Sequence, residues 1–182
     1  MAGSTAYAAV RAVQAKPGET VVVSAAAGGV GSLTVQLLRR AGVRVLGIAG
    51  KSNHDWLTSH WVEPVEYGDG LEDRLRAAAP GGVDAFIDGF GDGYVELAIK
   101  LGVAPHRINT IIDFEAATRF GTMTEGGMSA ATSDVLAELA ELIATRELTV
   151  EISARYPIEQ VREAYTELAK GHTRGKIVLR MR

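Results

Sequence analysis

Cysteine is absent from this chain of 182 residues. Disulfide bonds, cysteine nucleophiles and cysteine-ligated zinc are therefore excluded within it, and a reducing cytoplasm is the expected setting. No apolar run approaches the roughly 18 residues of a membrane-spanning helix, and the opening MAGSTAYAAV lacks the basic and long apolar regions of a signal peptide. We expect a cytoplasmic protein with no membrane partner.

An excess of positive charge is also missing. The chain has 19 Lys and Arg against 22 Asp and Glu, and its net charge is −3. Because a basic patch is the usual footprint of nucleic-acid binding, we expect no nucleic-acid partner. Aromatic residues make up only 6%, but 47% of residues are apolar, which is ordinary for a folded domain. The length predicts about one domain with a sizeable core.

Short apolar runs alternate with amphipathic segments along most of the chain. The runs predict strands at 20–25, 43–48, 62–67, 83–88 and 107–113. The segments predict helices at about 4–15, 33–42, 55–61, 71–79 and 94–101. Alternation at this spacing is typical of βαβ units. The predicted fold class is therefore α/β, a Rossmann-type doubly wound parallel sheet.

The tail of the chain has a different pattern. A long helix is predicted from about Ser133 to Thr145, followed by LTVEIS (148–153). A helix with Pro157 at its start and Gly171 past its end comes next, and KIVLRM (176–181) closes the chain as a strand. We predict a boundary near Thr149, with residues 1–148 as the Rossmann domain and 149–182 as a strand-helix-strand extension.

The stretch SAAAGGVGSLTVQLLRRAG (24–42) lies between the first predicted strand and a helix. Aligned on the dinucleotide fingerprint G-x-G-x-x-G, its positions are Ala26, Gly28 and Gly31, with alanine replacing the first glycine. Glycine in such a turn lets a diphosphate approach the backbone, and the helix start presents free N–H groups to the negative charge. The pattern predicts a nucleotide site that includes Gly28, Gly29, Val30 and Gly31.

The end of the second strand bears on which nucleotide is bound. NAD-binding domains usually carry an Asp or Glu about 20 residues beyond the motif, to accept a hydrogen bond from the ribose 2′-hydroxyl. Here that place is Lys51, within AGKSNHD, and the first carboxylate is Asp55. A cation there suits a 2′-phosphate, although a solvated loop lysine is the alternative interpretation. We therefore expect NADP(H) as the cofactor in preference to NAD(H).

Five stretches together resemble the medium-chain dehydrogenase/reductase superfamily, and most closely its zinc-independent, NADPH-dependent quinone oxidoreductase branch. They are GSTAYAAV, VVVSAAAGGVG with the following VQLLRRAGVRVLGIAG, VDAFIDGFG, RINTIID and GHTRGKIVL, spanning about 3–179. Members of this family have an N-terminal GroES-like domain beside the cofactor domain, and the resemblance leads us to expect that this chain lacks that domain. The resemblance implies that 149–182 completes the catalytic domain in full-length relatives.

The resemblance also implies roles for individual residues. Gly50, Lys51, Ser52 and His54 would surround the 2′-phosphate, and Tyr67 would lie beside the adenosine end. Asp88, Gly89 and Phe90 would lie against the ribose on the nicotinamide side, and Thr110, Ile111 and Ile112 near the nicotinamide ring. Lys176 is a further phosphate candidate. Sheet-edge pairing, common in the family, makes a homodimer plausible.

Other chemistry has little support in the sequence. The four histidines lack metal-ligand spacing, and no residue is predicted to be catalytic or to bind metal. DGFGDG (88–93) superficially suggests a calcium loop, but Phe90 occupies a ligand position, so we interpret it as a turn at a strand end.

Hydride transfer needs little beyond a well-placed nicotinamide and an electron-poor acceptor. The expected function is the cofactor domain of an NADPH-dependent reductase that passes hydride to a small acceptor, a quinone or enone. We expect the chain to bind the cofactor and turn over poorly alone. Two alternatives stay open, a non-catalytic dinucleotide sensor and an enzyme whose cleft is completed by a second subunit.

Overall fold

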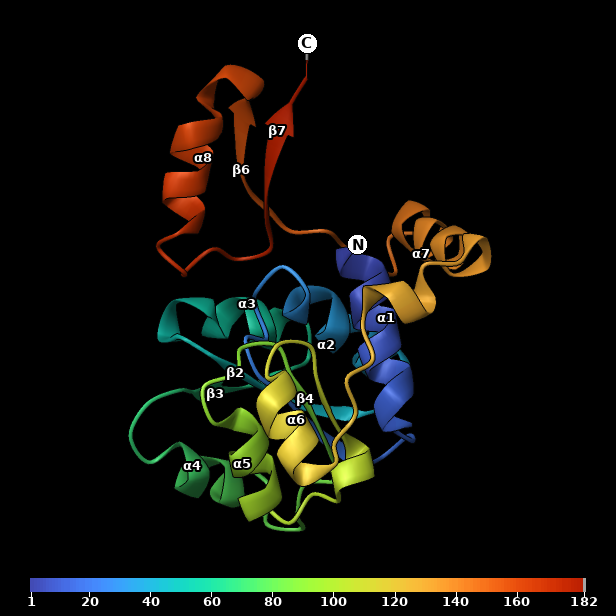
Figure 1. Cartoon of the computed structure of the whole chain (residues 1–182), viewed down its shortest axis with the longest axis vertical. Coiled ribbons are helices and arrows are strands. Elements are labelled where there is room, and N and C mark those ends of the chain that lie inside the picture. The colour runs from blue at the N-terminus through green and yellow to red at the C-terminus, as the bar shows by residue number, and fades with distance from the viewer. Residues whose placement is uncertain (182) are drawn as a thin grey trace.

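The computed structural model describes residues 1–181, so the last residue of the predicted extension, Arg182, lies outside the described part. For description, residues 1–148 are called the body and residues 149–181 the C-terminal unit (Figure 1). The body contains α1 (Ala2–Val13), β1 (Thr20–Val23), α2 (Gly31–Arg40), β2 (Arg44–Ala49), η1 (Lys51–Asn53), α3 (His54–Ser59), β3 (Glu63–Glu66), α4 (Leu71–Ala78), β4 (Ala85–Asp88), α5 (Tyr94–Lys100), η2 (Pro105–Arg107), β5 (Ile108–Thr110), α6 (Phe114–Phe120), η3 (Gly127–Ala130) and α7 (Ser133–Ala144). The C-terminal unit contains β6 (Ile152–Pro157), η4 (Ile158–Gln160), α8 (Val161–Leu168) and β7 (Lys176–Arg180).

The body is built on a five-stranded sheet in the order β3-β2-β1-β4-β5, and every pair is parallel. Val22 of β1 lies between Leu46 of β2 and Phe86 of β4. The chain builds outward from β1 to β3 and then returns to the other side of β1 for β4 and β5. This reversal is the topological switch of doubly wound folds, and it confirms the predicted Rossmann-type class.

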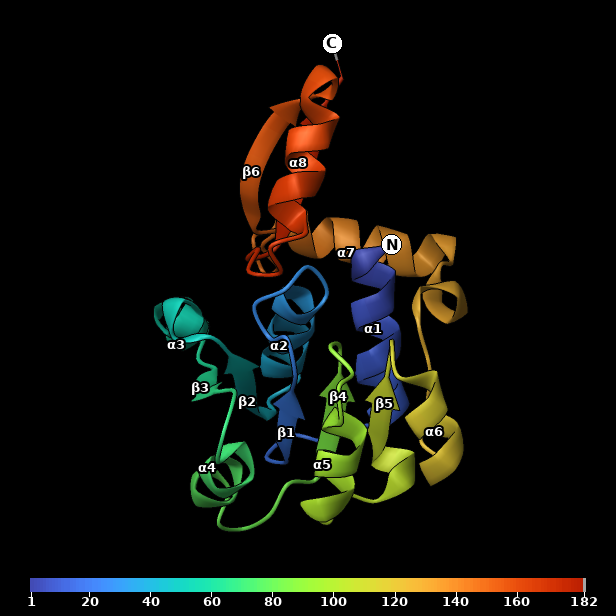
Figure 2. The ribbon, with the colours of Figure 1, turned by 60° about the vertical axis from the view of Figure 1, so that its left-hand side comes forward.

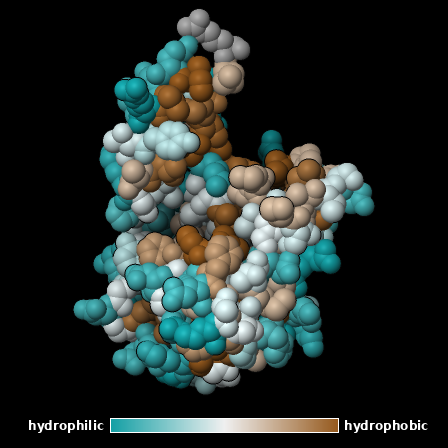
Figure 3. Space-filling view, viewed as in Figure 1, coloured by the Kyte–Doolittle hydropathy of each residue, from teal (hydrophilic) through white to brown (hydrophobic). Residues whose placement is uncertain are grey.

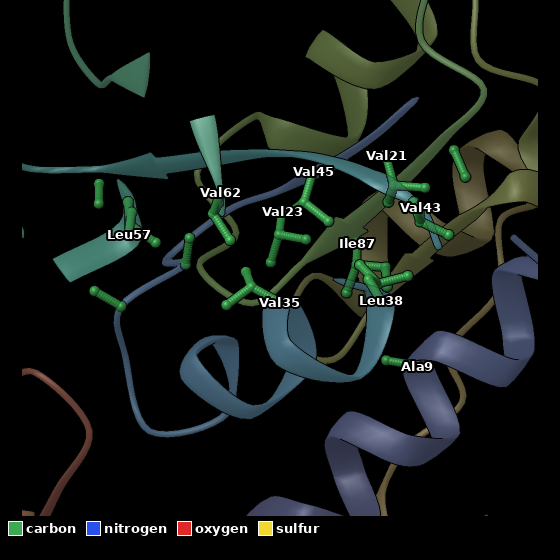
Figure 4. Close-up of a cluster of buried hydrophobic side chains, with 14 of the residues drawn as sticks. Ala9, Val21, Val23, Val35, Leu38, Val43, Val45, Leu57, Val62 and Ile87 are labelled. Carbon is green, nitrogen blue, oxygen red and sulfur yellow. The ribbon is translucent and has the colours of Figure 1, made fainter. Parts of the chain in front are cut away.

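Both faces of the sheet are covered, which explains why the central strand is apolar throughout. Val21 and Val23 of β1 face α1, α2 and α3, where they pack with Val35 and Leu38 of α2 (Figure 4). Val22, between them in sequence, faces the opposite side with α4 and α5. All four residues of β1 are buried, as expected for a strand of a parallel sheet covered on both sides. None of the helices in residues 1–181 is long and apolar enough to span a membrane.

The fifth strand is shorter than the predicted 107–113, and a helix follows it that the sequence analysis did not predict. The strand ends at Thr110, because Asp113 turns the chain into α6 by accepting a hydrogen bond from the N–H of Ala116 at 3.0 Å. This is an ordinary N-cap, and a strand cannot continue through it. Beyond α6, Met123 pairs with Asn109 in a single parallel bridge at the sheet edge.

The C-terminal unit forms its own two-stranded parallel sheet, β6 with β7, joined by α8. Figure 2 shows this unit above the carboxyl ends of the main sheet. Its first strand starts at Ile152, so LTVEIS lies mostly before it, because Leu148 is buried with the α7 cluster and Thr149 is bonded to Gln36. Pro157 ends that strand, and helical structure begins one residue later.

One face of the C-terminal unit is apolar and uncovered. Figure 3 shows hydrophobic side chains gathered over β6 and β7. The three core clusters of the body include no residue beyond Leu148, and within 149–181 only Ala164 buries its side chain. The unit therefore stabilises itself little through apolar burial, and it leaves an exposed surface of the kind that another domain or chain usually covers.

Candidate functional site

A cavity of about 600 Å³ lies at the carboxyl ends of β1, β2 and β4, beneath the C-terminal unit. Ligands of doubly wound folds bind in this position, and the volume is in the range of cofactor sites. The sequence-predicted residues on its wall are Gly28, Gly50, Ser52, Tyr67 and Phe90.

The glycine turn after β1 is packed so tightly that side chains are excluded from it. A Cβ on Gly31 would lie 2.1 Å from the carbonyl oxygen of Ala25, and one on Gly28 would lie 3.1 Å from the same atom. The N–H of Gly28 donates to that oxygen at 2.8 Å, and the N–H of Ser32 donates to the oxygen of Gly28 at 2.9 Å. Gly31 is therefore required by the packing of strand on helix.

The N–H groups at the start of α2 are available to a ligand. Those of Gly29, Val30 and Gly31 donate no hydrogen bond within residues 1–181, and α2 has no side-chain cap. Unpaired N–H groups at a helix start carry a partial positive charge that attracts phosphate. The turn thus has the chemistry of an anion site.

Lys176 brings a second positive charge to this turn from the C-terminal unit. A Cβ on Gly29 would lie 2.2 Å from Lys176 Nζ, so the ammonium rests directly on the glycine. The neighbouring N–H of Gly175 donates to the oxygen of Ala27 at 2.9 Å and holds the segment in place. Partial burial lowers the pKa of Lys176, and Nζ has no hydrogen-bond or ion-pair partner within the described chain.

The segment after β2 lies at the other end of the cavity. Tyr67 packs over Gly50, where a Cβ would lie 3.1 Å from the tyrosine oxygen. Gly50, Ser52 and Tyr67 line the cavity, whereas Lys51 and His54 lie beside it and not on its wall. Lys51 is exposed, and His54 Nε2 lies 3.4 Å from the oxygen of Ala49.

Asp88 and Thr110 have fully buried side chains. The Asp88 carboxylate accepts hydrogen bonds from Ser24 Oγ at 2.7 Å and from Thr110 Oγ1 at 2.8 Å. It also accepts from the N–H groups of Phe90 and Gly91, at 2.9 and 3.0 Å. These bonds join the ends of β1, β4 and β5. Neither side chain is free for a ligand, so any contribution they make is to hold the Gly89–Gly91 turn in position.

The remaining predicted residues on this side differ in exposure. Phe90 is 56% exposed and lines the cavity, and Ile112 is 52% exposed but is not on the cavity wall. Ile111 packs against the core, and Gly89 donates its N–H to Ser24 Oγ at 2.9 Å. The cavity therefore gathers only part of the predicted set. Gly28, Gly50, Ser52, Tyr67 and Phe90 lie on its wall, whereas 29–31, Lys51, His54, 88–89, 110–112 and Lys176 do not.

Several cavity residues were not predicted from the sequence. Asp92 and Tyr94 follow β4, Leu71 and Leu97 come from α4 and α5, and 171–173 come from the loop before β7. The motif GHTRGK, which carries the loop, was noted only for its lysine. The segment DGFGDGY was interpreted as a turn, and nothing in its residue types indicates that the turn faces a cavity.

Relatives of known sequence and structure match the chain over all or about half of its length. The Bacillus subtilis protein YfmJ, which carries the name of an NADP-dependent oxidoreductase, is 30% identical over 208 residues, covering 100% of this chain and 61% of that protein. Prostaglandin reductase 1 of Bos taurus is 39% identical over 104 residues, covering 54% of this chain and 32% of that protein. The quinone oxidoreductase of Coxiella burnetii has a TM-score of 0.85 at 30% identity, covering 100% of this chain and 59% of that chain.

The chain thus spans about three-fifths of the length of YfmJ and of the Coxiella enzyme. The family model described as zinc-binding dehydrogenase matches residues 20–179, from the first strand of the body to the last strand of the C-terminal unit. The chain therefore belongs to the zinc-binding dehydrogenase family, within the medium-chain dehydrogenase/reductase superfamily.

Proposed function

We propose that this chain is the NADP(H)-binding part of an oxidoreductase that transfers hydride from NADPH to a quinone or enone. The observation that carries the proposal is the partnerless ammonium of Lys176 resting on Gly29, beside the free N–H groups that open α2. Two sources of positive charge meet at one glycine turn, and no acidic side chain within residues 1–181 pairs with Lys176, so the turn fits the diphosphate of a dinucleotide. The name of YfmJ supports NADP as the nucleotide.

The residues at the end of β2 support NADP(H) in preference to NAD(H). Gly50, Lys51 and Ser52 follow the strand, and the first carboxylate, Asp55, is already within α3. An acidic side chain at the strand end would repel a 2′-phosphate, whereas an ammonium and a hydroxyl can bind it. In the proposed site, the 2′-phosphate lies against this segment and the diphosphate lies on 28–31.

Calorimetric titration of the chain with NADPH and with NADH tests the nucleotide preference. NADPH should bind more tightly, and Lys51→Ala should weaken NADPH binding by about 1.5–3 kcal/mol, roughly 10- to 150-fold in Kd, while leaving NADH unchanged. Lys16→Ala, which changes a lysine between α1 and β1, is the matched control. Equal affinity of the unchanged chain for both nucleotides would contradict the 2′-phosphate assignment.

The bound coenzyme would supply the hydride, and the chain would supply position. The buried Asp88 fixes the Gly89–Gly91 turn through the hydrogen bonds of its carboxylate, so that the ends of β4 and β5 keep one geometry. Holding reactants in a productive geometry is a large part of the catalysis that such a reaction needs. No side chain of this chain is assigned as a proton donor.

Zinc, which the family name implies, does not fit the residues of this chain. It contains no cysteine, and within residues 1–181 no three His, Asp or Glu side chains are grouped so that they could hold a metal ion. We therefore assign no role to a metal here. Electrostatic and steric placement of the coenzyme is the contribution that these residues can make.

We further propose that residues 149–182 belong to a second structural unit that completes the substrate cleft in longer relatives. The separate two-stranded sheet and its uncovered apolar face support this division. The chain alone should then bind NADPH but oxidise it slowly with a quinone. A quinone-dependent NADPH oxidation rate that equals that of a two-domain homologue would contradict the proposal.

Two further proposals concern the cellular compartment and the oligomeric state of the protein. The lack of cysteine supports a reducing cytoplasm. The apolar surface of the C-terminal unit supports self-association into a homodimer, and sedimentation velocity over a range of concentrations tests that state.

A further inference from the structure

The segment Asp88–Tyr94 after β4 has a backbone that is uncommon for its residues. Gly91, Asp92 and Gly93 have positive φ angles of 79°, 54° and 82°. A residue with a side chain seldom adopts this left-handed conformation, although Asp and Asn tolerate it best, and such backbone is concentrated at functional sites. The turn brings Phe90, Asp92 and Tyr94 onto one wall of the cavity.

This end of the cavity presents aromatic rings. Tyr67, Phe90 and Tyr94 line it together with Leu71 and Leu97. The rings of Phe90 and Tyr94 meet edge to face, with centroids 5.8 Å apart. Tyr67 and Phe90 are 48% and 56% exposed, so both rings are accessible to a ligand. Flat apolar walls of this kind suit a planar aromatic ligand.

Polar atoms without a protein partner line the same cavity, and Asp92 among them is exposed to solvent. Within residues 1–181, neither the Asp92 carboxylate nor the hydroxyls of Tyr67 and Tyr94 make a hydrogen bond or ion pair. Burial raises the pKa of Tyr94, and Asp88, Asp92 and Tyr67 raise it further, so these groups lie within electrostatic range of one another. An ionised carboxylate can only accept hydrogen bonds, whereas a tyrosine hydroxyl can donate or accept.

We propose that this end of the cavity recognises the adenine base of the coenzyme and that Asp92 selects it by accepting a hydrogen bond from the 6-amino group. The inference rests on the proposed coenzyme site. A base with a 6-oxo group, such as hypoxanthine, would present an acceptor to the carboxylate and be repelled. Opposite charges are then separated in the proposed site. Lys176 and the α2 amides attract the diphosphate at the glycine turn, whereas the adenine 6-amino group is a hydrogen-bond donor of the kind that the Asp92 carboxylate can accept from.

The test compares two nucleotides, NADPH and its hypoxanthine analogue, by fluorescence titration of the unchanged chain and of Asp92→Asn. The unchanged chain should bind NADPH roughly 10- to 100-fold more tightly than the analogue. Asp92→Asn should narrow or reverse that ratio, because a carboxamide can donate to the 6-oxo group. Asp69→Asn makes the same chemical change in an exposed loop outside the cavity wall and should keep the original ratio.

The ratio of the two Kd values separates the possible outcomes. It is insensitive to partial unfolding of a variant, since both nucleotides bind the same folded fraction. A ratio near one in the unchanged chain, or a ratio that Asp92→Asn leaves as it was, overturns the assignment of Asp92 while the proposed function stands. Failure of the unchanged chain to bind either nucleotide overturns the proposed function and this inference together.

Discussion

Replacing Gly31 with alanine is the sharpest test of how the glycine turn is built. The new Cβ would lie 2.1 Å from the carbonyl oxygen of Ala25 and 2.9 Å from both its carbonyl carbon and Ala26 Cα. Because these atoms are backbone, no rotamer change can relieve the clash, and the strand end or the start of α2 must move.

The expected cost follows from two opposing terms. Overpacking costs up to about 3 kcal/mol when backbone has to shift. Alanine returns up to about 1 kcal/mol, because it loses less conformational entropy on folding than glycine. The net loss of unfolding free energy is therefore about 2 kcal/mol, which for a chain of this length lowers Tm by roughly 4–8 °C.

Thermal denaturation followed by circular dichroism measures this loss. Gly81→Ala is the matched control, because a Cβ there meets no atom within 4 Å and its φ lies outside the left-handed region. The control should melt at the original temperature or slightly above it. If Gly31→Ala melts within about 1 °C of the unchanged chain, the packing argument for this glycine is refuted.

Three further predictions concern a second glycine of the turn, the buried Asp88 carboxylate and the Glu19–Arg107 ion pair. Gly29→Ala should change Tm little, because the severe contacts of its Cβ are with the flexible end of the Lys176 side chain and the nearest backbone atom, the Gly175 oxygen, is 3.2 Å away. It should weaken NADPH binding, and a large loss of stability without a loss of affinity would contradict this. Asp88→Ala should lower the free energy of unfolding, measured in urea, by about 3 kcal/mol or more, because the buried hydroxyls of Ser24 and Thr110 lose their acceptor. A loss below about 1 kcal/mol would contradict the structural role of the hydrogen bonds to Asp88. Burial alone would raise the pKa of Glu19, but hydrogen bonds from the Lys16 N–H and from Arg107 outweigh it and hold that pKa below its ordinary value of 4.5. The ionised Glu19 therefore stabilises the fold above about pH 4.5 and loses this effect as the pH falls through its folded pKa. Glu19→Gln should lower Tm at pH 7, and the difference in Tm should shrink as the pH is lowered below 4.5.

Most elements of the body could be predicted from the sequence, because the intrinsic propensity of the residues and their burial in the fold favour the same structure. The run TVVV is β-branched and lies buried in the middle of a covered sheet, so propensity and burial point to one structure. The strand predicted at 107–113 was too long because RINTIID is rich in β-branched residues, although Asp113 was a visible capping signal for the helix that follows.

The candidate site could be predicted only where a motif carries it. The glycine turn and its helix start are recognisable from spacing, and they lie where the motif requires. The aromatic end of the cavity is assembled from Tyr67, which follows β3, and from Phe90 and Tyr94, which follow β4. No local pattern joins such residues, because only the order of the strands brings their loops to one edge.

The low burial of the C-terminal unit affects the order in which parts of the molecule unfold. Its helix and paired strands bury one side chain, Ala164, so the entropy of ordering about thirty residues is offset mainly by backbone hydrogen bonds. Such a segment opens far more often than the sheet of the body. On heating, amide exchange and protease cleavage should reach β6, α8 and β7 first, and the melting curve should be broader than a single cooperative step allows.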